Sequence, residues 1–455
     1  MTSALTARGL LAIGMATVAC ARLPTGADGS DGATDAADVQ SSTVVPQEPA
    51  RIRFPNYPWL DEPWGRQGVD FRLIPYEPDF PDGPTTVDCG PGCRRLLQDL
   101  ADVGERQDLC VRDGILFTSL GGHIARVVLD DLSNPMRLEA IAPPPTRYRV
   151  TAWHVGCTPR DILLSLDQGR VDEGTAAIAR WNDTTLHAEP LVAFTRSLST
   201  SGSGTLTLGG FRALIGSDRL IAFDWTAAVP AARFGFAGTS ESWIMNIGVL
   251  DPIASGPRTV FEGFARDPVV SGDRVVGVSG FDCTLWRSGP SGNDRTFPPG
   301  RLGGGIDDIC RYPWIDGNRI AFVGVPPGPR GDHGSWHAFL GNADTGEYRQ
   351  LTPDTDRYIY RAATFVTGDW VVWLDARNRP PPEVAPEAYG GAFCLRRFEL
   401  WGYHIPSARE FRLVSGRSAR LGRIFNGRLY YQAAECQPVT GRDVWSIYEQ
   451  ELPTP

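Results

Sequence analysis

The chain repeats one pattern of apolar and polar positions. Each copy has apolar residues, a Gly beside Asp, Asn or Ser, one polar or bulky residue, and a strand-like run rich in Val, Ile, Leu, Phe and Trp. Two clear copies are "IDGNRIAFVGV" around Gly317 and "VTGDWVVWLD" around Gly368. Gly with Asp or Asn suits a hairpin turn, because these residues adopt positive φ at little cost. Each copy therefore predicts two antiparallel strands.

Seven segments follow the pattern, and the second and third match it least well. They are centred on Gly114, Asp161, Ser217, Gly272, Gly317, Gly368 and Gly427. Their spacing, from the mid-forties to about sixty residues, is close to that of propeller blades once variable loops are allowed.

A second hairpin follows the pattern and brings each unit to four strands. The clearest is "WHAFLGNADTGEYRQLTP" at Trp336 to Pro353, and Glu399 to Gly416 repeats its design. A small sheet that is apolar on both faces is not stable alone, whereas a ring of such sheets covers both faces of each one. The sequence predicts an all-β fold, a β-propeller of four-stranded antiparallel blades; seven blades are favoured, and six or eight stay open.

The last unit has only three strands, because the chain ends at "DVWSIYEQELPTP". We expect an early strand within Val69 to Pro78 to complete this blade and close the ring. The alternative is an N-terminal arm that lies on the surface.

The segment "IDGNRIAFVGV…WHAFLGNADTGEYRQLTP" resembles the TolB-type propeller repeat, in which "DG-x-x-IAF" opens the second strand and "TGE…LT" closes the fourth. The likeness covers roughly residues 260 to 420. It implies an architecture that binding proteins and accessory domains of enzymes share, and it does not identify an activity.

The first nineteen residues have the pattern of an export signal. Arg8 precedes an apolar run from Gly9 to Ala19. Eleven helical residues span roughly 17 Å, well short of the roughly 30 Å hydrocarbon core of a bilayer. The segment "TVAC" that ends at Cys20 resembles the lipobox of bacterial lipoproteins, which implies a signal peptide over 1–19 and acylation of Cys20, as with palmitate. An ordinary secretory signal with a chance cysteine is the alternative.

Residues 20–50 are small, polar and acidic, and predict a disordered tether ahead of a propeller domain over 51–455. Ala21 is not the aspartate that marks inner-membrane retention in Gram-negative lipoproteins. By that analogy we expect a lipid-anchored protein of the bacterial cell envelope, with the outer membrane favoured.

Eight further cysteines follow Cys20, an even number that predicts disulfides in an exported chain. They are Cys89, Cys93, Cys110, Cys157, Cys283, Cys310, Cys394 and Cys436. Proximity along the repeat favours Cys283 with Cys310 and Cys394 with Cys436, which leaves the first four to pair among themselves. A zinc site built from those four is the alternative, although their spacings do not fit a zinc ribbon.

Composition and charge exclude one class of partner. The 455 residues carry a net charge of −9, and all 44 basic residues are arginine. Because there is no basic stripe or tail to neutralise phosphates, we do not expect nucleic acid to bind.

The sequence offers no catalytic motif. There is no G-x-S-x-G, H-E-x-x-H, P-loop or dinucleotide fingerprint. His333 and His337 are expected to be solvent-facing loop residues and not a metal pair, and the carboxylates Asp307, Asp308 and Asp316 to be turn residues. We predict neither a catalytic residue, nor a cofactor, nor a metal site.

Two functions stay open. The favoured one is a membrane-anchored scaffold that binds an envelope protein or glycan at the propeller mouth or the loops around it. The alternative is a propeller enzyme, such as a polysaccharide lyase or hydrolase, with its site in the central funnel. Converging His, Asp, Arg or Tyr side chains in the funnel would favour the enzyme, and a shallow or plugged funnel would favour binding.

Overall fold

The computed structural model describes the strands and the short turns of the chain. The described ranges are 71–75, 89–99, 109–120, 123–141, 150–170, 173–197, 207–217, 219–230, 241–251, 255–261, 265–279, 282–288, 295–297, 310–325, 336–353, 359–378, 398–415, 418–436 and 443–455. The predicted signal peptide, Cys20 and the predicted tether lie outside them. No helix among the described residues is long and apolar enough to cross a membrane.

Each of the seven patterned segments begins a four-stranded antiparallel sheet. Blade 1 comprises β3 (Leu109–Arg112), β4 (Ile115–Leu120), β5 (His123–Val128) and β6 (Asp131–Ile141). Blade 2 comprises β7 (Val150–Cys157), β8 (Ile162–Arg170), β9 (Glu173–Asn182) and β10 (His187–Ser197). Blade 3 comprises β11 (Thr207–Gly216), β12 (Ile221–Pro230), β13 (Glu241–Asp251) and β14 (Ser255–Phe261).

The next three blades follow the same order. Blade 4 comprises β15 (Ala265–Ser271), β16 (Arg274–Ser279), β17 (Asp282–Arg287) and β18 (Arg295–Phe297). Blade 5 comprises β19 (Cys310–Asp316), β20 (Arg319–Gly324), β21 (His337–Asn342) and β22 (Tyr348–Gln350). Blade 6 comprises β23 (Arg361–Thr367), β24 (Trp370–Asp375), β25 (Glu399–His404) and β26 (Arg409–Val414).

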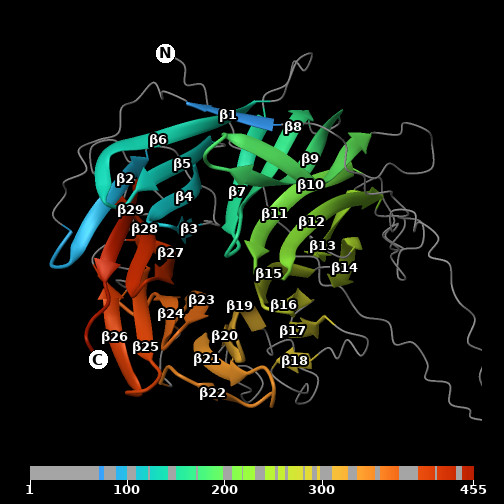
Figure 1. The fold of residues 1–455 in the computed structure, drawn as a ribbon. Coiled ribbons are helices and arrows are strands. Elements are labelled where there is room, and N and C mark those ends of the chain that lie inside the picture. Colours follow the sequence, from blue (N-terminus) through green and yellow to red (C-terminus); the bar gives the residue numbers. More distant parts are fainter. Residues whose placement is uncertain are drawn as a thin grey trace, which may run out of the picture. The chain divides into compact units, whose positions relative to one another are not determined.

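The seven sheets are arranged around an axis as a seven-bladed β-propeller, which confirms the predicted fold. The first strand of each blade contacts the first strand of the next, from β7 with β11 to β23 with β27, and β27 contacts β3 to complete the ring. In Figure 1 the blades follow one another in chain order, from teal through green and yellow to red. Apolar side chains from adjoining sheets pack together, as where Ala321 and Ala338 of blade 5 meet Trp373 of blade 6.

The ring closes through a different early strand from the one that the sequence predicts. Blade 7 comprises β27 (Ser418–Phe425), β28 (Arg428–Cys436) and β29 (Asp443–Glu451), and its fourth strand is β2 (Cys93–Asp99), which pairs with β29. Within the predicted segment 69–78, β1 (Phe71–Pro75) does form a strand. It pairs instead with β6 and β10, the outer strands of blades 1 and 2, and so joins them into one nine-stranded sheet.

The patterned turns do more than reverse the chain, because they also join neighbouring blades. The backbone N–H of Gly317 donates to Ser271 Oγ of the preceding blade at 2.9 Å, and the Gly317 carbonyl accepts from Arg274 at 3.3 Å. One blade further on, Gly368 N–H donates to Asp316 Oδ2 at 2.9 Å, and the Gly368 carbonyl accepts from Arg319. We call this arrangement the turn clasp.

The two weakest copies of the pattern differ because their turns are longer. In blade 2 the hydroxyl of Thr158 accepts the backbone N–H groups of Arg160 and Asp161 at 3.1 and 2.8 Å. In blade 3 the hydroxyl of Ser217 accepts those of Arg219 and Leu220 at 3.2 and 3.0 Å. Arg160 and Arg219 therefore occupy equivalent exposed positions in their turns.

The innermost strands of blades 4 to 6 share a β-bulge that the pattern does not reveal. Asp267, Tyr312 and Ala363 are each the third residue of such a strand, and their φ angles are +58°, +51° and +47°. The register with the second strand shifts at each of these places. An extra residue bends a strand and increases its twist, so the bulges shape the wall of the ring.

Candidate functional site

The innermost strands of all seven blades line a cavity of about 190 Å³ on the axis of the ring. Its described lining residues are Leu109, Val155, Gly156, Cys157, Gly216, Val270, Trp314, Phe365, Thr367, Arg423, Ile424 and Phe425. Of these, Arg423 alone is charged, and its guanidinium lies 4.0 Å from the centre of the Trp314 ring. The described part of the axis is thus narrow and largely apolar.

A larger cavity of about 610 Å³ lies between blades 1 and 2, and we call it the inter-blade pocket. It is lined by the turn between β3 and β4 of blade 1, by the β7–β8 and β9–β10 turns of blade 2, and by the adjoining strand ends. The described lining residues are Arg112, Asp113, Ile115, Phe117, Arg160, Asp161, Ile162, Arg180, Trp181, Asn182, Asp183, Thr184, Thr185, His187 and Glu189. Its volume is within the range of small-molecule sites, roughly 300 to 1,000 Å³.

Side-chain contacts to the backbone hold the rim of this pocket in place. Asn182 Oδ1 accepts the N–H groups of Thr184 and Thr185, both at 3.0 Å, which fixes the turn between β9 and β10. The hydroxyl of Thr158 fixes the other blade 2 turn in the same way. Because the local sequence orders both turns, the rim does not depend on a ligand for its shape.

Most charged groups of the pocket are paired across short distances. Arg180 lies 2.7 Å from Glu189 and 3.9 Å from Asp161. The hydrogen bond to Glu189 raises the pKa of Arg180 above its ordinary value, against the effect of burial. Arg126 of blade 1 contacts both carboxylate oxygens of Asp183 of blade 2, at 3.0 and 3.1 Å. This last pair spans the two blades that enclose the pocket.

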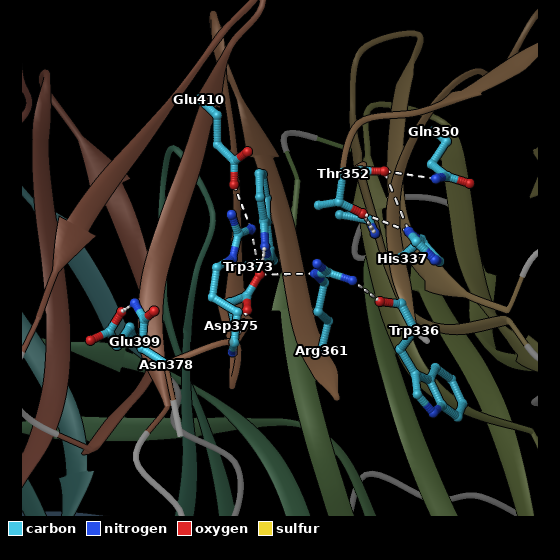
Figure 2. A network of polar contacts seen from close by, with 12 residues as sticks. Trp336, His337, Gln350, Thr352, Arg361, Trp373, Asp375, Asn378, Glu399 and Glu410 are labelled. Carbon is cyan, nitrogen blue, oxygen red and sulfur yellow. Dashed lines mark hydrogen bonds and ion pairs between the residues drawn. The ribbon is translucent and has the colours of Figure 1, made fainter. Parts of the chain in front are cut away.

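A second polar cluster is buried where blades 5 and 6 meet (Figure 2). The carboxylate of Asp375 accepts from Arg361 Nε at 2.8 Å, from Trp373 Nε1 at 3.1 Å, and from the backbone and side-chain nitrogens of Arg377 at 2.8 and 2.6 Å. Arg361 also donates to the carbonyl of Trp336 in blade 5 at 2.5 Å. Burial lowers the pKa of the Arg361 guanidinium, and the charge of Asp375 opposes this effect.

Arg377 extends the cluster toward the outer strand of blade 6. Its guanidinium lies 2.5 Å from Glu410 and 3.9 Å from the centre of the Trp401 ring. Beside it, Asn378 Nδ2 donates to Glu399 Oε2 at 2.7 Å, and Arg412 also pairs with Glu399. Figure 2 shows Asn378 and Glu399 facing each other at the end of blade 6. These contacts stabilise the blade, and none of them faces the two cavities described above.

Aromatic rings surround this cluster on the side of blade 5. The Trp336 and Tyr360 rings are 6.0 Å apart, and the Arg311 guanidinium lies 4.8 Å from the centre of the Trp336 ring. Burial raises the pKa of the Tyr312 phenol, and a hydrogen bond with Tyr360 adds to the effect. Tyr312 is therefore a neutral phenol at physiological pH.

The histidines do not converge on one place. His337 was expected to face solvent, but it begins β21, is only 3% exposed, and its Nδ1 lies 3.0 Å from Thr352 Oγ1. His404 Nδ1 lies 2.8 Å from Ser407 Oγ in a turn, and His187 lines the inter-blade pocket. His333 lies outside the described residues. Among the described residues, no group of three or more His, Cys, Asp or Glu side chains could hold a metal ion.

The carboxylates singled out from the sequence also separate. Asp307 and Asp308 lie outside the described residues. Asp316 is the last residue of β19, directly before the turn, and it accepts a hydrogen bond from the next blade in the turn clasp. Sequence reasoning missed the inter-blade pocket, because its residues come from turns of two blades and no short motif contains them.

Six of the described cysteines form three disulfides. They are Cys89–Cys93, Cys110–Cys157 and Cys283–Cys310, with Cα–Cα distances of 5.5, 5.6 and 5.4 Å. The last is the predicted pair, and the first four cysteines do pair among themselves. Cys110–Cys157 joins blade 1 to blade 2, and Cys283–Cys310 joins blade 4 to blade 5. The predicted pair of Cys394 with Cys436 includes a residue outside the described part of the chain.

Solved structures similar to this chain are β-propeller proteins. An acylaminoacyl peptidase from Pyrococcus horikoshii is 14% identical with a TM-score of 0.46, over 77% of this chain and 53% of that chain. An oligogalacturonate lyase in complex with manganese is 12% identical with a TM-score of 0.44, over 86% and 99%. The β-propeller domain of the trilobed protease from Pyrococcus furiosus is 11% identical with a TM-score of 0.44, over 76% and 98%.

These likenesses concern the fold, and at such identities they carry no argument about activity. The chain spans about half the length of the acylaminoacyl peptidases that it matches. No family model matches the chain. No curated protein matches it either.

Proposed function

We propose that this protein is a lipid-anchored β-propeller of the bacterial cell envelope that binds an envelope protein or a glycan and does not catalyse a reaction. The lipobox-like segment ending at Cys20 and the acidic stretch after it support the anchor and the tether. Two or three acyl chains hold a protein on a membrane nearly permanently, at about 0.8 kcal/mol per buried methylene. Ala21 after the cysteine favours the outer membrane.

The lining of the axial cavity is the observation that carries the binding role. Propeller enzymes that use the central depression need acid, base or metal-binding side chains to converge there. Here the described lining is apolar apart from Thr367 and Arg423, and Arg423 is stacked on Trp314. Ordered turns meanwhile frame a larger polar pocket between two blades. This arrangement favours a preformed binding surface over a catalytic funnel.

We also propose that the repeats are of the TolB type. The support is the recurrence of the Gly turn in five of the seven blades, at Gly114, Gly272, Gly317, Gly368 and Gly427, and of the Asn-ordered second turn. Asn182 and Asn342 each accept two backbone N–H groups in equivalent turns of blades 2 and 5. The repeat type concerns ancestry and architecture, and it leaves the ligand open.

The anchor is tested by substituting Cys20→Ser and fractionating the cells that express the protein. We expect the wild-type chain in the membrane fraction and the variant in the soluble fraction, with the same melting temperature for both. A variant that stays with the membrane to the same extent as the wild type would contradict acylation at Cys20.

The binding role is tested by capturing envelope extract on the purified propeller. We expect a saturable protein or glycan partner that is recovered chemically unchanged. Cleavage of a polysaccharide by the purified chain, at a rate that scales with its concentration, would instead support the propeller-enzyme alternative.

A further inference from the structure

The inter-blade pocket has the chemistry of a site for an uncharged, hydroxyl-rich ligand. Most of its charged side chains are already paired, as Arg180 with Glu189 at 2.7 Å and Asp183 with Arg126 at 3.0 Å show. A ligand that carries several charges must compete with these pairs or leave part of its own charge uncompensated. A neutral ligand meets no such cost.

The rim of the pocket offers hydrogen-bonding groups that the protein itself does not use. Within the described part of the chain, the Arg160 guanidinium has no ion pair, and the hydroxyls of Thr184 and Thr185 make no hydrogen bond. Ionised carboxylates such as Asp161 accept but do not donate. A sugar hydroxyl both donates and accepts, so it can satisfy the arginine and the carboxylate that lie beside each other.

The inner wall of the pocket is aromatic. The Phe117 and Trp181 rings meet edge to face with their centres 5.1 Å apart, and they are 1% and 3% exposed. The Trp181 indole N–H has no acceptor among the described residues, although it is buried. A buried donor without a partner costs about 1–3 kcal/mol, so a ligand oxygen that reaches it is bound correspondingly more tightly.

We propose that the inter-blade pocket binds a neutral oligosaccharide, with Arg160 and Asp161 on its hydroxyls and Trp181 on its inner end. This proposal rests on the binding role proposed above and names the ligand class and the residues. The pocket is distinct from the axial cavity, because the two share no lining residue among those described.

The experiment uses the mature protein and isothermal titration with cellotetraose, maltotetraose, chitotetraose and the acidic tetragalacturonate. We expect at least one neutral tetrasaccharide to bind, and Arg160→Ala to weaken it about 10-fold, the effect of losing one hydrogen bond from a charged group. Arg219→Ala is the matched control, because Arg219 occupies the equivalent turn position in blade 3 and does not line the pocket. It should leave the affinity unchanged.

A second variant keeps the test decisive if the first disturbs folding. Trp181→Phe removes the indole N–H and keeps an aromatic ring, and we expect it to weaken the same tetrasaccharide with a shift in melting temperature measured alongside. Binding of tetragalacturonate alone, no binding of any neutral tetrasaccharide, or equal losses in Arg160→Ala and Arg219→Ala would each overturn the proposal. Any of these results together with release of Cys20→Ser from the membrane would leave the lipid-anchored role standing.

Discussion

Asp375 accepts hydrogen bonds from three side chains although its own side chain is fully buried. Removing one partner of a buried pair leaves the other charge uncompensated, which is much more costly than removing both. In Asp375→Asn the Arg361 guanidinium would keep its charge at 1% exposure and lose its carboxylate. We expect this substitution to lower the free energy of unfolding by about 3–5 kcal/mol, measured by urea denaturation.

Asp369→Asn is the matched control, because that side chain is 56% exposed in the turn between β23 and β24 and, among the described residues, pairs only with Arg319 at 3.4 Å. A surface substitution of this kind changes stability by about 0.5 kcal/mol or less. Equal effects of the two substitutions would show that the cluster around Asp375 does not stabilise the junction of blades 5 and 6.

The same carboxylate gives stability a defined dependence on pH. Burial by itself raises the pKa of Asp375, but the hydrogen bond from Arg377 and the charges of Arg361 and Arg377 hold it below its ordinary value. A carboxyl whose pKa falls on folding stabilises the fold above its unfolded pKa of about 3.9, and this contribution is lost as the pH falls through the folded pKa.

The difference in unfolding free energy between wild type and Asp375→Asn should therefore be constant from about pH 8 to about pH 5 and shrink only below about pH 4. Urea denaturation of both proteins over this range measures it. A difference that shrinks as the pH rises would contradict a lowered pKa at this position.

At the scale of single residues, the sequence predicts few of the side-chain contacts. Asp316 was expected in a turn and lies at the end of β19 directly before one, whereas His337 was expected to face solvent and is buried against Thr352. The members of the Asp375 cluster lie on different strands and share no motif, so only the paired strands bring Arg361 opposite Asp375. Contacts that depend on sheet register are not visible in a linear pattern.

At the scale of single elements, the positive φ angle of the turn explains why glycine recurs in the pattern. Gly368 has a φ of +52°, and a Cβ added there would meet nothing within 4 Å. The cost of a side chain at this position is therefore conformational and not steric. An L-residue with positive φ costs about 1–2 kcal/mol, whereas Asn tolerates that region better.

We expect Gly368→Ala to destabilise the protein by about 1–2 kcal/mol and Gly368→Asn by less, as measured by thermal denaturation. Asn426 occupies the same turn position in blade 7 with a φ of +50°, which shows that the fold accepts asparagine there. If Asn were as costly as Ala, the clasp and not the φ angle would determine which residue occurs at this position.

Most elements are predictable because turn chemistry is local. All seven turns stand where the pattern puts them, and the second hairpins of blades 5 and 6 form as β21 with β22 and β25 with β26. The weaker second and third copies reflect real differences, because Thr158 and Ser217 order longer turns by accepting backbone N–H groups. The bulges at Asp267, Tyr312 and Ala363 were missed, since no residue type marks them.

At the scale of the whole molecule, the ring depends on contacts between distant parts of the chain. The sequence correctly required an early strand to complete the last blade, but it placed that strand within Val69 to Pro78 and not at Cys93–Asp99. Both β1 and β2 are short strands near the N-terminus, and nothing local distinguishes a strand that pairs with β29 from one that pairs with β6 and β10. The inter-blade pocket was missed for a similar reason, since its walls belong to two blades.

The strand that closes the ring, β2, carries buried side chains. Leu96 and Leu97 of β2 are 0% and 1% exposed, and Arg94 lies 2.6 Å from Glu449 of β29, whose side chain is 1% exposed. Removing β2 exposes both the edge of β29 and the apolar surface that the two leucines cover. Full burial of each leucine is worth about 1.5–3 kcal/mol, so their loss alone costs about 3–6 kcal/mol.

Three chains distinguish the contributions of β1 and β2 to stability. They are the mature protein, a chain that starts at Cys89 and lacks β1, and a chain that starts at Ala101 and lacks both strands. We expect the second chain to melt cooperatively as a monomer, and the third to melt at a much lower temperature and to aggregate, because an unpaired strand edge recruits other chains. A synthetic peptide of residues 89–100 should restore part of the lost stability of the third chain. Equal melting temperatures of the second and third chains would mean that the ring is held closed by the contact of β27 with β3 and by the lateral packing of blades, and not by the pairing of β2 with β29.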